Sequence, residues 1–210
     1  MTDKIGIKKL GDKYFVFDAK DVEQLRTNYR IVGALNGTLP QFPLQNTFYG
    51  LPLILLPEEV ELLVNRGWAH IIEKPSKATS STTMMHNKEP HVTTIVQKQT
   101  RLNADVFDFF WSQGYYITSG IKFGGQFLLY PNDPMCVHSE YIVSVKQTKD
   151  QDILPLELIG MGRTATNVRK TFVIVAAEQE EEDHEQEQEQ EQEQQETNQM
   201  VCYSIEWAGF

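Results

Sequence analysis

Three side chains in the second half of the chain can together move protons and bind a phosphate: the phenol of Tyr130, the imidazole of His138 and the ammonium of Lys170. A histidine, whose unperturbed pKa is ~6.5, can act as a general acid or a general base near neutral pH. A fixed ammonium can stabilise negative charge that grows in a transition state. The set predicts an active site without a metal ion, and we expect no cofactor.

Each of these three residues lies at the end of an expected element, where a rigid sheet can aim side chains at one substrate. Apolar runs and alternation predict strands, a helix and a further strand in this region, at residues 126–130, 140–146, 155–167 and 171–177. Tyr130 closes the first strand, and His138 ends the Pro-Asn-Asp-Pro loop that follows it. Lys170 directly precedes the last strand.

The first 74 residues predict a small α/β N-terminal domain. A hairpin is expected over 4–17, around Gly11-Asp12. Asp18 is expected to cap a helix that ends near Gly33, followed by a loop down to residue 50. The rest of this domain predicts a strand, a helix and a strand at residues 53–56, 57–67 and 68–72.

The composition of residues 75–100 changes to Lys, Ser, Thr, His and Asn with little apolar periodicity, which predicts a flexible linker. Residues 101–210 predict a second domain, which begins with a helix at 103–112 and ends with a strand at 200–207. Within it, residues 178–199 form an insertion rich in Glu and Gln that has no apolar residues. Such a segment buries too little surface to offset its ordering entropy, so we expect it to be disordered.

The net charge of −10 comes from this insertion and not from the chain as a whole. Residues 178–196 hold 11 of the 29 acidic residues and no lysine or arginine. Outside them, 19 basic residues face 18 acidic ones. The expected folded part is therefore close to neutral, and its charge neither favours nor excludes a nucleic-acid substrate.

Cysteine usage and hydropathy limit the compartment and the kinds of site that this protein is expected to have. No short spacing links Cys136 to Cys202, so we expect neither a disulfide scaffold nor a zinc cluster, and a cytosolic or nuclear compartment is the simplest reading. The amino end has no apolar signal region, and the apolar run 51–56 is too short to cross a bilayer. We expect a soluble, non-secreted protein without membrane insertion.

Long motifs carry a resemblance to a known family. In the second domain they are YYITSGIKFGGQFLLYPNDPMCVHSEYIV at 115–143, GRTATNVRKTFVIVA at 162–176 and YSIEW at 203–207. These resemble the catalytic domain of the tRNA-splicing endonucleases. RIVGALNGTLPQFP at 30–43 and GLPLILLPEEVELL at 50–63 resemble the amino-terminal part of one catalytic subunit of that family.

The resemblance implies a role for each candidate site residue. Tyr130, His138 and Lys170 match the catalytic triad of the family, and Arg163 and Trp207 match a pair that clamps a base of the RNA. The implied fold of residues 101–210 is a restriction-endonuclease-like mixed sheet flanked by helices. The implied reaction is attack of a 2′-hydroxyl on the adjacent phosphate, which gives a 2′,3′-cyclic phosphate and a 5′-hydroxyl. Which of Tyr130 and His138 is the base and which the acid stays open.

The resemblance also implies partners. The chain would cut intron-containing pre-tRNA at the 3′ splice site, as a tRNA-intron lyase within a nuclear heterotetramer. Structural subunit 15 would bind it directly through the strand at 200–207, and catalytic subunit 2 and structural subunit 54 would complete the assembly. A near-neutral chain of 24.2 kDa also needs other subunits to grip a whole tRNA by its phosphates.

Two other functions remain to be weighed against this one. A non-catalytic structural subunit of the same complex would share the fold but lack the triad, and this is the main alternative. A magnesium-dependent DNA nuclease would need an acid-x-Lys pair beside a further acid, and Asp18-Ala19-Lys20 lies in the wrong domain for it. Singly, each triad residue also has a plain structural reading: a packed strand-end aromatic, a loop histidine bonded to backbone, or a helix-end cation.

Overall fold

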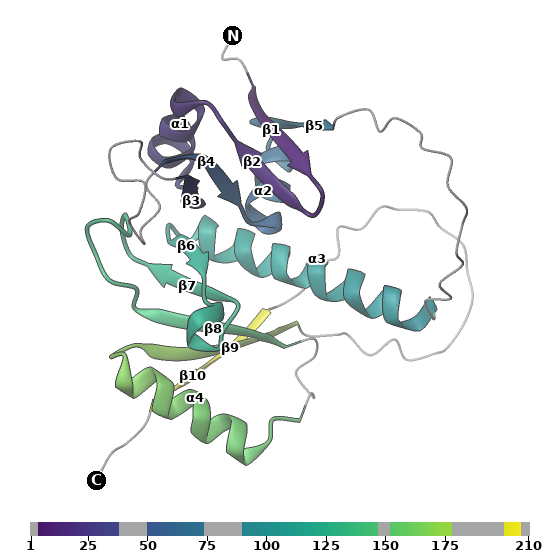
Figure 1. Ribbon diagram of the computed structural model, residues 1–210. Coiled ribbons are helices and arrows are strands. Elements are labelled where there is room, and N and C mark those ends of the chain that lie inside the picture. Colours follow the sequence, from purple (N-terminus) through teal and green to yellow (C-terminus); the bar gives the residue numbers. More distant parts are fainter. Residues whose placement is uncertain (1–3, 38–49, 74–89, 147–151, 178–199, 207–210) are drawn as a thin grey trace.

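Two five-stranded mixed sheets and four α-helices make up the fold in the computed structural model, which describes residues 4–37, 50–73, 90–146, 152–177 and 200–206 (Figure 1). Each sheet combines antiparallel pairs with one parallel pair, β1 with β5 and β8 with β9. The mixed α/β fold class expected from the sequence is confirmed.

The first sheet contains five short strands in the order β3-β4-β2-β1-β5. Their bounds are β1 Ile5–Leu10, β2 Lys13–Val16, β3 Ala34–Gly37, β4 Gly50–Leu55 and β5 Ala69–Glu73. The hairpin of β1 and β2 turns at Gly11, which has a φ of 66°. Helix α1, Ala19–Tyr29, begins where the Asp18 carboxylate accepts from the Lys20 amide, as expected from the sequence. Helix α2, Pro57–Asn65, begins with a proline.

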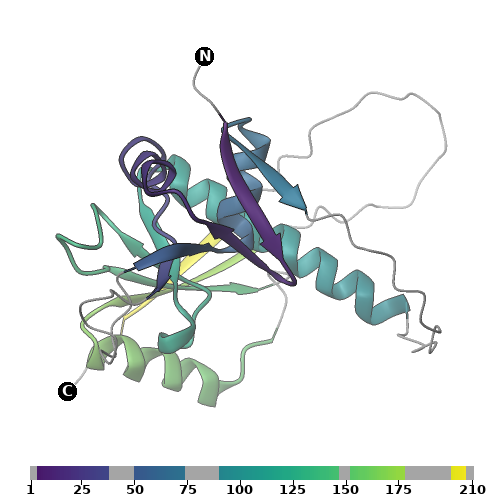
Figure 2. The same cartoon turned by 45° about the horizontal axis from the view of Figure 1, so that its top comes forward.

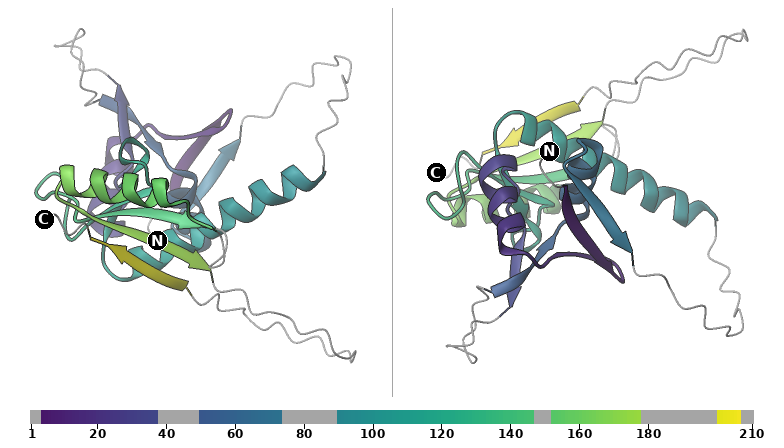
Figure 3. Two further views of the ribbon diagram at one scale, coloured as in Figure 1. Left: turned by 90° about the horizontal axis from the view of Figure 1, so that it is seen from below. Right: turned by 90° about the horizontal axis from the view of Figure 1, so that it is seen from above.

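The second sheet has the order β10-β9-β8-β7-β6 and is covered on both faces. Its strands are β6 Tyr116–Ser119, β7 Phe127–Tyr130, β8 Tyr141–Lys146, β9 Thr171–Ala177 and β10 Met200–Ile205, and a 3-10 turn, Ile121–Phe123, separates β6 from β7. Helix α3, Pro90–Ser112, lies on one face and helix α4, Pro155–Asn167, on the other (Figure 3). In the described part of the chain, no helix is long and apolar enough to cross a membrane.

One apolar core runs through both sheets. Helix α3 lies between the two sheets (Figures 1 and 2). It contacts α2 on the side of the first sheet, and β6 and β8 of the second sheet. Buried residues from both sides of it form a single cluster that includes Ile5, Leu63, Phe107, Leu129 and Val143. The two parts of the chain therefore pack together through a shared core, because each covers apolar surface of the other.

Two elements differ from the sequence-based expectation. Residues 34–37 form β3, although Gly33 and the prolines beyond it favoured a loop. Helix α3 starts at Pro90, whereas we expected a linker up to residue 100 and a helix only from 103. The helical pattern of that stretch is weak because many of its residues are polar or β-branched. Pro90 occupies the first helical position, where proline is favoured, and marks the start of the helix. The acidic insertion 178–199 and the linker 75–89 lie outside the described residues.

Candidate active site

A hollow of about 1020 Å³ opens at the edge of the second sheet where β8 and β9 begin. The end of α4, the loop after β7 and the end of β10 surround it. Its lining residues are Pro131, Val137, His138, Ser139, Glu140, Tyr141, Ala165, Thr166, Arg169, Lys170, Thr171, Ile205 and Glu206. Its size is that of a typical ligand site, so it can take a nucleotide-sized group.

His138 and Lys170, two of the three residues singled out from the sequence, line this hollow together. The Lys170 Nζ donates a 2.7 Å hydrogen bond to the carbonyl oxygen of Ser139, the residue after His138. Burial lowers the pKa of the Lys170 ammonium. The cation is thus held against the loop that carries the imidazole.

The end of α4 explains how Lys170 reaches this position. Arg169 has the left-handed φ of 53°, and the Lys170 amide donates to the Ala165 carbonyl at 2.9 Å. This arrangement closes the last turn of the helix and redirects the chain straight into β9. Lys170 is therefore the junction between helix and strand, with little backbone freedom.

Tyr130 lies at the same edge of the sheet but does not line the hollow. The pairing of Leu129 with Tyr141, and of Tyr141 with Thr171, places Tyr130 and Lys170 in one row, two strands or about 10 Å apart. The Tyr130 hydroxyl lies 3.4 Å from the Thr118 Oγ1 on β6, a long distance for a bond between hydroxyls. In this conformation the phenol is oriented toward β6 and packs against a second apolar cluster, which lies between α4 and the second sheet.

The two residues expected to clamp a base are less closely associated with the hollow. Arg163 is exposed on α4 and does not line it. Thr166, one helical turn further along the same face, does line it, so Arg163 is within a turn of its rim. Trp207 lies outside the described residues, and the base clamp stays a prediction.

Arg169 is a candidate site residue that was not predicted from the sequence. Its exposed guanidinium side chain lines the hollow beside Lys170, while the carboxylates of Glu140 and Glu206 line it as well. A non-glycine residue with positive φ is a strained conformation that often marks a functional site. Helices commonly end with a glycine in the left-handed conformation, but here an arginine stands at that position, directly before Lys170. That substitution is the signal the sequence offered.

Metal ligands are not gathered at this site. In the parts of the chain that the structure describes, no group of three or more His, Cys, Asp or Glu side chains is close enough to hold a metal ion. Asp18, the acid of the acid-x-Lys pair considered above, accepts from the Lys20 amide at 2.7 Å as the cap of α1. That bond assigns it a structural role.

Two known families match the chain, one over the first sheet and the other over strands β6 to β9 of the second sheet. Residues 5–74 match the family described as "TSEN34-like, N-terminal domain". Residues 100–185 match the family described as "tRNA intron endonuclease, catalytic C-terminal domain". The second match contains Tyr130, His138 and Lys170.

Individual relatives agree with these two families. The chain is 28% identical to the "Probable tRNA-splicing endonuclease subunit sen34" of Schizosaccharomyces pombe, over 99% of both chains. It is 35% identical to the "tRNA-splicing endonuclease subunit Sen34" of Homo sapiens over 37% of this chain and 24% of that protein. It is 35% identical to the subunit SEN34 of Saccharomyces cerevisiae over 47% of this chain and 30% of that protein. The match thus spans less than a third of the human and budding-yeast relatives.

Proposed function

Because this chain belongs to the tRNA-splicing endonuclease family, with both the N-terminal domain and the catalytic domain of its Sen34 branch, we propose that it is the catalytic subunit that cuts pre-tRNA at the 3′ splice site. The family supports a tRNA-splicing endonuclease role. The observation that carries the catalytic role is the hollow shared by His138 and Lys170, whose ammonium is bonded to the residue next to the imidazole. A structural subunit that does no chemistry has no need of this pairing.

The proposed reaction is a transesterification within the RNA. The 2′-oxygen attacks the adjacent phosphorus, a base removes the proton of the 2′-hydroxyl, and an acid protonates the departing 5′-oxygen. The products are a 2′,3′-cyclic phosphate and a 5′-hydroxyl, so atoms and protons balance without water. Each proton transfer contributes roughly 10² to 10⁴ in rate when the group is well placed.

Lys170 would stabilise the negative charge on the phosphorane. An ammonium has three N–H donors, and the bond to the Ser139 carbonyl uses one of them, so the others can reach a phosphate oxygen. The lowered pKa of Lys170 reflects desolvation, and a desolvated cation interacts more strongly with an anion than one in water does. Arg169 would add a second cation at the rim of the same hollow.

His138 and Tyr130 would carry the two proton transfers. We propose that His138, which lines the hollow beside Lys170, protonates the leaving 5′-oxygen. Tyr130 would act at the 2′-hydroxyl from the neighbouring strand end. Its weak 3.4 Å contact with Thr118 is easily given up when substrate arrives.

A modified substrate tests this chemistry directly. Replacing the 2′-hydroxyl at the 3′ junction by hydrogen removes the nucleophile, so cleavage there should stop while the 5′ junction is still cut. Cleavage of the unmodified substrate should persist in EDTA and leave a cyclic phosphate. Cleavage of the deoxy substrate, or loss of activity in EDTA that magnesium restores, would instead indicate attack by a metal-activated water.

Partners and location complete the proposal. We propose that the chain acts on intron-containing pre-tRNA in the nucleus, in a heterotetramer with structural subunit 15, catalytic subunit 2 and structural subunit 54. Strand β10 is the edge of the second sheet, and Tyr203 on it is 55% exposed, which suits pairing with structural subunit 15 by strand addition. Arg163 and Trp207 would clamp a base of the RNA near the cut.

A further inference from the structure

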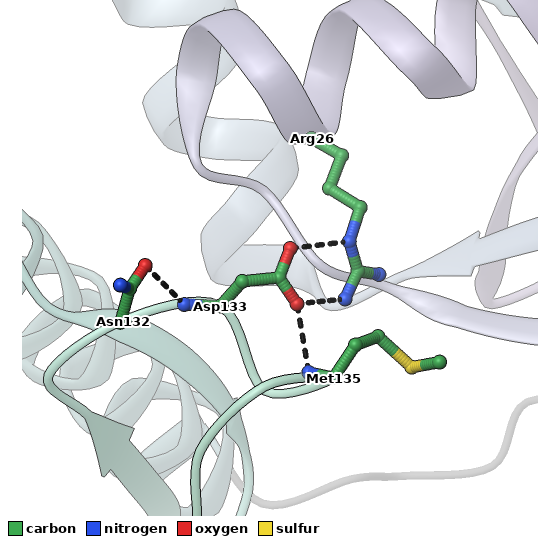
Figure 4. A network of polar contacts seen from close by, with 4 residues as sticks. All are labelled: Arg26, Asn132, Asp133 and Met135. Carbon is green, nitrogen blue, oxygen red and sulfur yellow. Dashed lines mark hydrogen bonds and ion pairs between the residues drawn. The ribbon is translucent and has the colours of Figure 1, made fainter.

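An ion pair joins the N-terminal part of the chain to the loop that carries His138. The Arg26 side chain, on α1, donates from Nε to Asp133 Oδ2 at 2.9 Å and from Nη2 to Asp133 Oδ1 at 2.6 Å (Figure 4). Two parallel bonds between planar groups fix orientation as well as distance. Asp133 is thus held in one place by a residue that is 107 positions away in the sequence.

Asp133 in turn shapes the loop between β7 and His138. Its Oδ1 also accepts from the Met135 amide at 2.7 Å, and its carbonyl accepts from the amides of Cys136 at 2.8 Å and Val137 at 3.2 Å. These bonds form a tight turn around one residue and end immediately before His138. A displacement of Asp133 therefore moves the backbone that delivers the imidazole.

The other end of the loop is held as well. The Ser139 carbonyl accepts from Lys170 Nζ, and the Glu140 amide donates to the Leu129 carbonyl at 2.9 Å, where β8 begins. His138 therefore lies between two fixed points. One is supplied by the proposed catalytic cation and the other by Arg26.

Helix α1 is itself anchored to the catalytic part. The Trp111 Nε1 donates to the Tyr29 carbonyl at 2.8 Å, and the Arg30 Nη2 donates to the Trp111 carbonyl at 2.9 Å. One residue further on, Ile31 forms a parallel bridge with Ile117 of β6. Arg26 therefore extends from a helix whose carboxyl end is tied to the same sheet, so it can act as a rigid support.

We propose that Arg26 is a positioning residue for cleavage: through its paired bonds to Asp133, the N-terminal part holds the loop so that His138 faces the hollow. This inference rests on the proposed function, and it identifies the N-terminal part as a component of the active site. It predicts that the pair acts on the rate of the chemical step and hardly on folding. The side chains of Arg26 and Asp133 are 31% and 26% exposed, so solvent screens the pair and its contribution to stability should be about 1 kcal/mol or less.

The chain offers a matched control. Arg66, the residue directly after α2, donates to Asp108 on α3 at 2.8 Å, so this pair also joins the N-terminal part to the catalytic part. Asp108 lies on the helix covering the face of the sheet opposite α4. Asp108→Asn therefore removes the charge from a similar bridge without touching the loop, and Asp133→Asn is its counterpart, because an asparagine Oδ1 can still accept from the Met135 amide.

The experiment uses the full chain reconstituted with its partner subunits and an intron-containing pre-tRNA. Single-turnover rate constants are measured at each junction over a range of enzyme concentrations, for wild type, Arg26→Ala, Arg26→Lys, Asp133→Asn, the double variant Arg26→Ala/Asp133→Asn, Asp108→Asn and His138→Ala. The melting temperature of each complex is recorded alongside. The enzyme concentration at half-maximal rate separates binding from the rate at saturation.

We expect Arg26→Ala and Asp133→Asn each to lower the saturating rate at the 3′ junction by roughly 10- to 100-fold, the scale expected for a misplaced catalytic group. The double variant should be no slower than the slower single variant, because both changes act on the same pair. Arg26→Lys should recover part of the rate, since lysine keeps the charge but cannot donate two parallel hydrogen bonds as the planar guanidinium does. For these variants of Arg26 and Asp133, the enzyme concentration at half-maximal rate, the melting temperature and the rate of 5′ cleavage should match those of Asp108→Asn.

Other outcomes overturn the inference. Wild-type 3′ rates in Arg26→Ala would show that the pair does not position the loop, and an equal loss at both junctions or a lower melting temperature would indicate a defect of assembly or folding. His138→Ala keeps the two proposals apart. If it abolishes 3′ cleavage while Arg26→Ala does not slow it, the positioning role fails and the proposed function stands; if His138→Ala cleaves normally, the proposed function fails.

Discussion

The Lys170 ammonium lies 2.7 Å from the carbonyl oxygen of Ser139 and donates to it, so the start of β9 is bonded to the residue that follows His138. Two residues that are 31 positions apart in the chain therefore meet at one point of the hollow. Because Lys170 also closes the turn at the end of α4, the cation, the helix end and the histidine loop form one connected unit.

The charge of Lys170 should limit cleavage on the alkaline side. Burial lowers the pKa of its ammonium, so activity should fall at a lower pH than the value of ~10.4 for a free lysine allows. In Lys170→Arg the guanidinium stays protonated, so the fall should move to higher pH even if the rate at the optimum is lower. Single-turnover rates at the 3′ junction from pH 6 to pH 10, corrected for hydrolysis of the RNA alone, measure this. Superimposable alkaline limbs for the two proteins would show that another group titrates.

The direction of proton transfer can be assigned with a sulfur leaving group. A substrate with a bridging 5′-sulfur at the 3′ junction needs no acid, because a thiolate leaves readily without a proton. It should restore cleavage by His138→Ala to within about tenfold of wild type, since the missing acid accounts for roughly 10² to 10⁴ in rate. Tyr130→Phe should stay slow on it. The reverse pattern would exchange the two roles.

Arg169 should combine a cost in folding with a benefit in catalysis. Its φ of 53° disfavours any residue with a side chain, so Arg169→Gly should raise the free energy of unfolding by about 1 kcal/mol. The same change removes a cation from the hollow and should slow 3′ cleavage by about tenfold. Arg169→Lys keeps the charge and should cleave close to the wild-type rate. Denaturant unfolding and single-turnover rates test the two effects separately, and a glycine variant that cleaves normally would exclude Arg169 from the site.

Glu59 should make stability depend on pH. Glu59 is 1% exposed, and its carboxylate accepts from the amides of Gly33 at 3.0 Å and Leu56 at 2.8 Å. Burial raises its pKa from 4.5 to about 7. Between these two values the folded state binds more protons than the unfolded state, so the free energy of unfolding should fall as pH rises, by about 3 kcal/mol in all at ~1.4 kcal/mol per pKa unit.

The matched variant for this test is Glu59→Gln, which cannot ionise. It should be less stable than wild type near pH 5, because its amide NH₂ must face a backbone N–H group, and the difference should shrink as pH rises. Its stability curve between pH 5 and pH 8 should lack the part of the slope that Glu59 contributes. Denaturant unfolding of both proteins at four pH values measures this, and parallel curves would show that Glu59 does not titrate in this range.

Much of the fold was predictable because local signals agreed with the tertiary structure. Helix α4 runs over the expected residues 155–167, since proline begins it and an apolar strand follows. Asp18 caps α1 as expected. The missed strand β3 is held by its pairing with β4, a long-range contact that residues 34–37 do not reveal by themselves.

The candidate site was predictable in its residue types but not in its geometry. The row that contains Tyr130 and Lys170 follows from strand ends, yet the orientation of the phenol toward Thr118 depends on side-chain packing. The bonds between Arg26 and Asp133 depend on how two parts of the chain dock through a shared core. Neither residue stands out in the sequence, because a charged residue on a helix and an acid in a turn have ordinary local roles.

The measurement that tests the central claim most directly is cleavage of intron-containing pre-tRNA by the reconstituted complex in EDTA, with wild type compared to His138→Ala in this chain alone. We expect the wild type to cut both junctions and to leave a cyclic phosphate at the 3′ junction. His138→Ala should fail at that junction by about 10² or more and still cut the 5′ junction. Equal cutting of both junctions by the variant would contradict a catalytic role and identify the chain as a structural subunit.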